Sequence, residues 1–192
     1  MAASPRADDL CRTEAEWACL ARLRELSAEK DGPLERHGVR VFLLCLELSR
    51  RGGYTVDREL LLCAAFLHDA GLLPGVATDD LYVRDGRRVT EDLLATHGWP
   101  PERLALVGET VERHHEVRSQ WRRGAEVELL RRADLIEVSA GVVAYGLSRG
   151  WIRGLFRAVP RDGFVRGIGT LVYRVLRDRP STLPRVFAPG KG

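Results

Sequence analysis

The chain has 192 residues, of which 45% are hydrophobic and 30% are charged, and its formal net charge at pH 7 is +3. This length and composition predict one folded domain over residues 1–192 and exclude a disordered or fibrous chain. Most of the 30 basic residues are arginines, but they form no dense patch interleaved with aromatic residues, so we expect no nucleic-acid partner.

Helical periodicity recurs along the whole chain, without a convincing alternating strand pattern, and it predicts an all-α fold. Residues 75–86 are expected to form a polar loop. In chain order, the apolar pattern together with its Gly, Pro and capping residues predicts helices at about 9–28, 33–50, 57–71, 87–97, 101–118, 125–145 and 163–178.

We predict a core at about 30–145 and a C-terminal helical extension at 146–192, both within one domain. The extension is expected to pack over the bundle. The alternative is a lid or a dimer contact that brings Trp151 and Arg153 near the functional site. A homodimer is compatible with such a bundle, although no sequence feature establishes one.

The N-terminus and the cysteines predict a cytoplasmic protein. Residues 1–9 carry no signal-peptide-like apolar segment, and no apolar run approaches the ~20 residues of a membrane span. Cys45 and Cys63 lie in apolar helical patterns, and no Cys-x-x-Cys pair is present. We therefore expect free thiols in a reducing compartment and no membrane partner.

Several histidines and aspartates occupy apolar faces of the predicted helices, where a buried polar group needs a partner. Each of them alone is explained by a hydrogen-bonded core residue. Three or more on separate inward faces favour a shared metal ion, and imidazole and carboxylate ligands suit zinc, iron, manganese or nickel. The candidates are His37, His68, Asp69, His114, His115 and Asp134.

The motif residues and their order resemble the HD superfamily of metal-dependent phosphohydrolases. His37 comes first, His68-Asp69 follows within Leu-Leu-Cys-Ala-Ala-Phe-Leu-His-Asp-Ala-Gly, and Asp134 lies within Leu-Leu-Arg-Arg-Ala-Asp-Leu-Ile, so the likeness covers roughly residues 30–140. The resemblance implies a single HD-domain helical bundle with a metal site in its core. It also implies a divalent ion (Zn, Mn, Fe, Ni or Co), held by His37, His68, Asp69 and Asp134.

Two positions decide which members of the family the chain resembles: Leu72, and the pair His114 and His115. Some nucleotidase members carry a catalytic glutamate three residues after the motif aspartate, where this chain has Leu72. His114 and His115 resemble the paired histidines that hold a second metal in binuclear members, although the Gly-Tyr-Pro signature of the cyclic-dinucleotide phosphodiesterases is missing. The expected number of metal ions is therefore one or two per chain.

The resemblance implies an enzyme that hydrolyses a phosphate ester, nucleotide-like or of another small phosphorylated metabolite, through metal-activated water. In this hypothesis Asp69, His114 and His115 are catalytic. Phosphate contacts are predicted from the arginines closest in sequence to these motifs, because a guanidinium binds phosphate in a bidentate manner. They are Arg36, Arg40, Arg113 and Arg118.

Two other functions stay open at this point. The first keeps the metal centre but changes the chemistry on a small non-phosphate substrate. Residues 84–98 also resemble, more loosely, the cyanamide-hydratase-like branch, which implies an HD-fold hydratase or lyase. A di-iron oxygenase would use the same centre. The second is a non-catalytic helical binding module, in which the polar residues form a structural network or a pocket.

Overall fold

The computed structural model describes residues 5–76, 78, 81–164, 166, 167, 169, 170, 173 and 177. Within these residues all regular elements are helical, which confirms the predicted all-α fold. The elements are α1 (Ala7–Leu10), α2 (Glu14–Ser27), α3 (Pro33–Gly52), α4 (Arg58–Leu67), the 3-10 helix η1 (Ala70–Leu72), α5 (Tyr82–Thr96), α6 (Pro101–Glu112), the 3-10 helix η2 (Trp121–Arg123), α7 (Ala125–Val138) and α8 (Arg149–Ala158).

Local signals in the sequence fix where the longer helices begin and end. Thr13 and Glu16 form a capping box at the start of α2. Asp57 accepts a hydrogen bond from the backbone N–H of Leu60 and so caps α4. α3 begins with Pro33 at its first position and ends at Gly52. The next residue, Gly53, has a φ of 67°, the left-handed conformation typical of a helix C-terminus.

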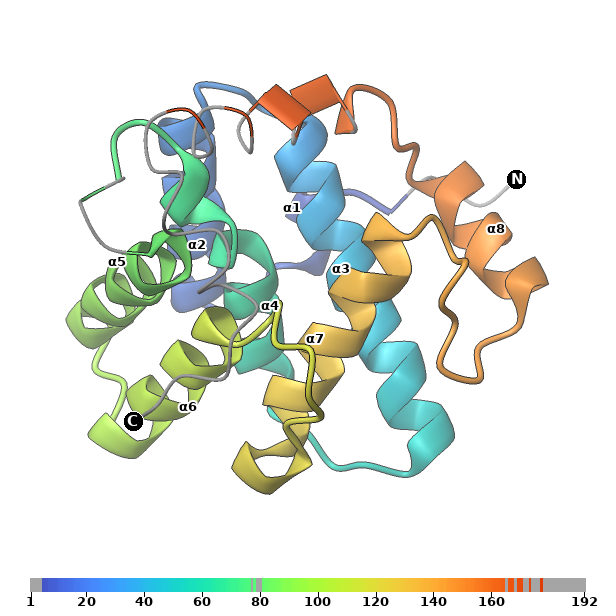
Figure 1. The fold of residues 1–192 in the computed structure, drawn as a ribbon. Helices are drawn as coiled ribbons and strands as arrows, with labels where there is room; N and C mark the ends of the chain where they lie inside the picture. The colour runs from blue at the N-terminus through green and yellow to red at the C-terminus, as the bar shows by residue number, and fades with distance from the viewer. Residues whose placement is uncertain are drawn as a thin grey trace.

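Helix α4 forms the centre of the bundle, because all of its residues from Leu60 to Leu67 are buried. It packs against α2, α3, α5, α6 and α7. Figure 1 shows α3 and α7 side by side, with the pair α5 and α6 on one side of them and α8 on the other. His68 and Asp69, which directly follow α4, therefore lie among these helices.

Two of the predicted boundaries are wrong for a tertiary reason. α5 begins at Tyr82, not at 87, because Leu81, Tyr82 and Val83 are buried in a small apolar cluster with Leu72. The close approach depends on Gly71, where an added Cβ would lie 1.8 Å from the carbonyl oxygen of Tyr82. The predicted loop 75–86 is therefore helical over its last residues.

Other boundaries differ at the C-terminal ends of helices. α6 ends at Glu112, before the predicted 118, and α7 ends at Val138, before the predicted 145. The helix α8 was not predicted; it buries Ile152 and Leu155 against the core. Half of the predicted helix 163–178 falls outside the described residues; within it, the described residues 164, 166, 167, 169, 170, 173 and 177 are helical.

In α8, the side chain of Trp151 is partly buried against the core and Arg153 is exposed. Among the described residues, no helix combines the length and the apolar character that crossing a membrane requires.

Candidate metal centre

Four helical elements bring the motif residues to one buried place. His37 lies in the second turn of α3, His68 is the C-terminal cap of α4, Asp69 precedes η1, and Asp134 lies in the third turn of α7. All four are buried. The abrupt change from α4 to η1 at Asp69 turns its carboxylate toward the same point as the His68 ring.

The donor atoms of these residues lie at the spacing of ligands around one small cation. Nε2 of His37 is 3.0 Å from Nε2 of His68 and 3.4 Å from Oδ1 of Asp134. Oδ2 of Asp69 is 3.6 Å and 3.5 Å from the same two imidazole nitrogens. Tetrahedral ligands with bonds of about 2.1 Å stand roughly 3.4 Å apart, so the cluster has the dimensions of a metal site.

The ring orientation of two histidines is set by their own helices. Nδ1 of His68 lies 3.0 Å from the carbonyl oxygen of Ala65, and Nδ1 of His114 lies 2.6 Å from that of Val111. A carbonyl accepts only, so each Nδ1 carries a proton, and Nε2 is the ring atom left to face the cluster. Both rings therefore present a ligand atom to the cluster.

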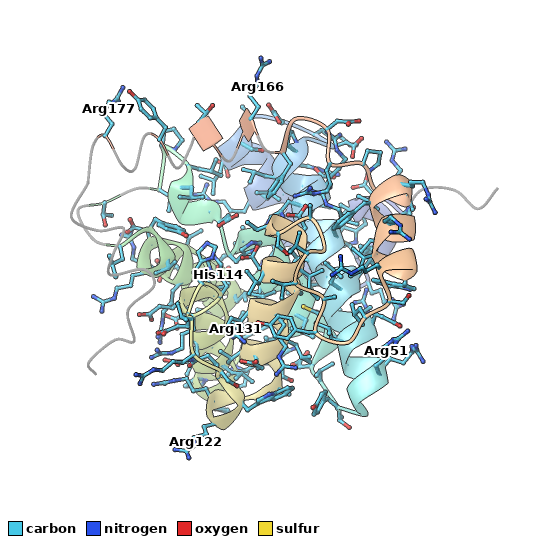
Figure 2. All side chains as sticks on the ribbon, turned by 45° about the vertical axis from the view of Figure 1, so that its right-hand side comes forward. Arg51, His114, Arg122, Arg131, Arg166 and Arg177 are labelled. Atoms are coloured by element: carbon cyan, nitrogen blue, oxygen red, sulfur yellow. The ribbon has the colours of Figure 1, made fainter. Side chains whose placement is uncertain are left out.

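His114 and His115 face the same aspartates from the other side. Nε2 of His114 lies 3.5 Å from Oδ1 of Asp69, and Nδ1 of His115 lies 3.4 Å from Oδ2 of Asp134. The oxygens that face His37 and His68 are the other two, Oδ2 of Asp69 and Oδ1 of Asp134. Each carboxylate thus offers one oxygen to each histidine pair. His114 lies in the interior of the molecule, whereas Arg122 and Arg166 project outward (Figure 2).

The electrostatics keep the carboxylates ionised. Burial alone would raise the pKa of Asp69, but the nearby His68 and His114 outweigh it and hold the pKa well below its usual range. For Asp134, the histidines His37 and His115 outweigh burial in the same way and lower the pKa to about 2. Both side chains are anions at neutral pH.

Burial dominates at two of the histidines. It lowers the pKa of His68 to about 4 against the pull of Asp69, and it lowers the pKa of His115 to about 4 together with the nearby His114. These two rings are therefore neutral at pH 7, which is the form that binds a metal.

His115 and Asp69 are the most exposed members of the cluster. Their side chains are 24% and 10% exposed, against 3% or less for His37, His68, His114 and Asp134. The Tyr82 ring lies beside His115, with the two ring centroids 6.1 Å apart. Burial, followed by the charges of Asp69 and Asp134, raises the pKa of Tyr82, so its phenol stays protonated.

Glu137 belongs to the centre, although it was not predicted. It lies one turn after Asp134 in α7, is fully buried, and places Oε2 3.2 Å from Nδ1 of His37. A carboxylate behind a histidine ligand fixes the ring and its tautomer. The available sequence signal was its spacing of three residues from Asp134 on a helix face that is otherwise apolar.

The predicted phosphate-binding arginines take different positions. Arg40 is fully buried and bonds Glu137 and the carbonyl oxygen of Pro160. Arg36 bonds the carbonyl oxygens of Asp31 and Asp162. These contacts favour a supporting role for both side chains over the predicted contact with phosphate.

The other two arginines follow α6. Arg113 pairs with Glu109 and Glu116. Arg118 is exposed in the segment between α6 and η2. Leu72, at the position of the family glutamate, is buried in an apolar cluster and offers no carboxylate to the centre. The structure thus brings the six predicted histidines and aspartates together, but not the four arginines.

A bundle of helices that encloses a cluster of histidines and aspartates defines a class of protein with a candidate metal site in its core. The HD domain family model matches residues 34–139, more than half of the chain, so the chain belongs to the HD domain family. A comparison with curated proteins found no match. Most HD domain proteins are metal-dependent hydrolases, and the fold, the motif order and the buried cluster agree with this membership.

Proposed function

We propose that this chain is a metal-dependent phosphohydrolase that cleaves a phosphate ester of a small, nucleotide-like or otherwise phosphorylated metabolite. One observation carries the proposal: Asp69 and Asp134 each turn one oxygen to the pair His37 and His68 and the other to His114 or His115. Carboxylates shared in this way suit two neighbouring cations, an arrangement used in phosphoryl transfer.

The residues present fit the divalent ions that the family binds. Oδ1 of Asp69 and Nε2 of His114 are buried and have no hydrogen-bond partner among the described residues. Such atoms are costly to bury unless a ligand satisfies them. When bound, a divalent ion would polarise a phosphoryl oxygen and make water acidic enough to attack near neutral pH.

In the proposed reaction the chain's own groups orient the reactants and move protons. Asp69 remains ionised and is the more exposed of the two aspartates, which suits it to accept a proton from the attacking water. His115 stays neutral at pH 7, so it acts as a ligand or as an N–H donor to the substrate and not as a cationic acid. The protonated phenol of Tyr82 can donate a hydrogen bond beside His115.

The test is a screen of the purified chain loaded with Mn, Fe, Co, Ni or Zn. Phosphomonoesters and phosphodiesters of nucleosides and of small metabolites are the substrates, and cyanamide is included. We expect phosphate release or diester cleavage, and we expect Asp69→Asn to lower kcat by about 10²–10⁴-fold. Asp92→Asn, an exposed change on α5, is the matched control and should not alter kcat.

Two results of this screen would contradict the proposed phosphohydrolase activity. If no ester is cleaved with any metal and cyanamide is hydrated, the centre performs hydratase chemistry. If neither class reacts although metal is bound, the chain is not a phosphohydrolase of the proposed kind.

A further inference from the structure

Glu137 has two carboxylate oxygens with separate partners. Oε1 accepts hydrogen bonds from Nε of Arg40 at 2.7 Å and from Nε of Arg161 at 3.1 Å. Oε2 faces Nδ1 of His37 at 3.2 Å. Because two guanidinium groups occupy Oε1, the carboxylate cannot rotate without breaking both ion pairs, and Oε2 is held toward the His37 ring.

Residues 160–164, which we name the strap, complete this arrangement. Arg40 donates to the carbonyl oxygen of Pro160 at 2.8 Å, and Nη2 of Arg161 donates to the backbone carbonyl of Glu137 at 2.8 Å. Phe164 stacks on the His37 ring, with centroids 4.5 Å apart and an interplanar angle of 20°. The strap therefore touches His37 directly and also through Glu137.

The backbone of the strap is shaped for this contact. Gly163 has a φ of +76°, and an added Cβ would lie 3.0 Å from Cγ of Pro33. A residue other than glycine is strained in this conformation. In Figure 1 the strap lies at the start of α3, which begins at Pro33, one turn before His37.

His37 differs in this respect from the other buried histidines. The rings of His68 and His114 are fixed by carbonyl oxygens three residues earlier in the chain, which their own helices supply. The ring of His37 depends on α7 and on the strap instead. Arg161 and Phe164 lie outside residues 34–139, the part that matches the HD domain.

We propose that the strap is a positioning element for the metal centre. Arg161, through Glu137, and Phe164, by stacking, hold the His37 ring with Nε2 directed at the cluster, so the C-terminal part of the chain sets the affinity for the divalent ion. The inference rests on the metal binding in the proposed function, and it does not depend on which substrate is hydrolysed.

The test compares metal dissociation constants in the full chain, measured for Mn²⁺ and Zn²⁺ by competition with a chromogenic chelator. Arg161→Met keeps the aliphatic stem and removes the bonds to Glu137; we expect 10–100-fold weaker binding, the range typical for the loss of such supporting partners. Phe164→Leu is expected to weaken binding several-fold. Arg161→Lys should restore part of the affinity, and Arg157→Met, an exposed change in α8, should leave it unchanged.

The melting temperature of each metal-free variant separates positioning from general destabilisation. Variants that melt early but bind metal with the wild-type constant would show that the strap only stabilises the fold, and this overturns the proposal. If the variants show the expected changes in metal affinity but the wild-type chain cleaves no ester, only the proposed phosphohydrolase activity is contradicted. The failure of one proposal can therefore be told from the failure of the other.

A second measurement applies if Arg161→Met does not fold. Coupling between sites is reciprocal, so metal binding to the wild-type chain must stabilise the strap. We expect slower hydrogen exchange at the amide of Phe164, which bonds the carbonyl oxygen of Arg161, and at that of Gly167, which bonds Gly163. Unchanged exchange at both amides on saturation with Mn²⁺ overturns the proposal.

Discussion

Oδ1 of Asp69 lies 3.5 Å from Nε2 of His114, and neither atom has a hydrogen-bond partner in the described part of the chain. The His114 ring cannot turn its other nitrogen to the carboxylate, because Nδ1 is engaged by the carbonyl oxygen of Val111. Nε2 of His114 and Oδ1 of Asp69 therefore face each other, and Asp69 outweighs the effect of burial and raises the pKa of His114. A cation between them satisfies both atoms at once.

This relationship predicts two divalent ions per chain. In the double variant His114→Ala/His115→Ala we expect one ion, because the remaining donors of His37, His68 and the two aspartates stay in place. Elemental analysis after dialysis against Mn²⁺ or Zn²⁺ measures the count. A wild-type chain that holds one ion, unchanged in the double variant, would show that these histidines serve another purpose.

Metal removal should lower the stability of the chain. An ion that binds only the folded state adds about 2.7 kcal/mol when its concentration is 100 times the dissociation constant. We expect the melting temperature to rise on addition of Mn²⁺ or Zn²⁺ and to return to its starting value with excess chelator. Asp134→Asn removes an anionic ligand that faces both histidine pairs, so most of the metal-dependent shift should disappear.

The control for this measurement is Asp92→Asn, which lies on the exposed face of α5. It should show the full metal-dependent shift. If Asp134→Asn shifted as much as this control, Asp134 would not be a ligand.

The residues of the centre could be predicted because they lie on apolar helix faces or directly follow apolar helices, where a polar side chain is conspicuous. Glu137 has the same kind of position, but what makes it part of the centre is its contact with His37 and with Arg161, and the sequence does not show that Arg161 returns to α7. For Arg40 the charge suggested phosphate, whereas its full burial follows from its pairing with Glu137.

The elements that sequence reasoning missed share a physical cause. The start of α5 depends on burial of Leu81 and Tyr82 against Leu72, which is a tertiary contact. α8 contains Gly150 and Gly154, residues of low helix propensity, and it forms because Ile152 and Leu155 are buried. In both cases packing overrides a weak local preference.

Gly71 gives a prediction about the packing of η1 against α5. In Gly71→Ala the new Cβ would lie 1.8 Å from the carbonyl oxygen of Tyr82, a backbone atom, so η1 and the start of α5 must separate. We expect a loss of about 1–3 kcal/mol in the free energy of unfolding, the usual cost of overpacking. Denaturant titration measures it, and Gly150→Ala, where the added Cβ meets no atom within 4 Å, is the control.

Glu128 gives a prediction about acid stability. It is fully buried, and Arg131, the backbone N–H of Gln120 and Arg132 outweigh burial and lower its pKa to about 2, against 4.5 for a free side chain. Its bond to Gln120 holds the segment that follows His115. Since the folded pKa is depressed, the stabilisation of roughly 3 kcal/mol is complete well above pH 4.5.

This contribution should be lost as the pH falls from 4.5 toward 2, because protons then bind the unfolded chain first. We expect Glu128→Gln to unfold more easily at pH 7 and to show a flatter decline of unfolding free energy between pH 5 and about 2.5, measured by denaturant titration of the metal-free chain. Glu25→Gln, with a carboxylate that is 69% exposed, should follow the wild-type curve. Parallel curves for Glu128→Gln and the wild type would contradict the depressed pKa and would leave the acid sensitivity to other carboxylates.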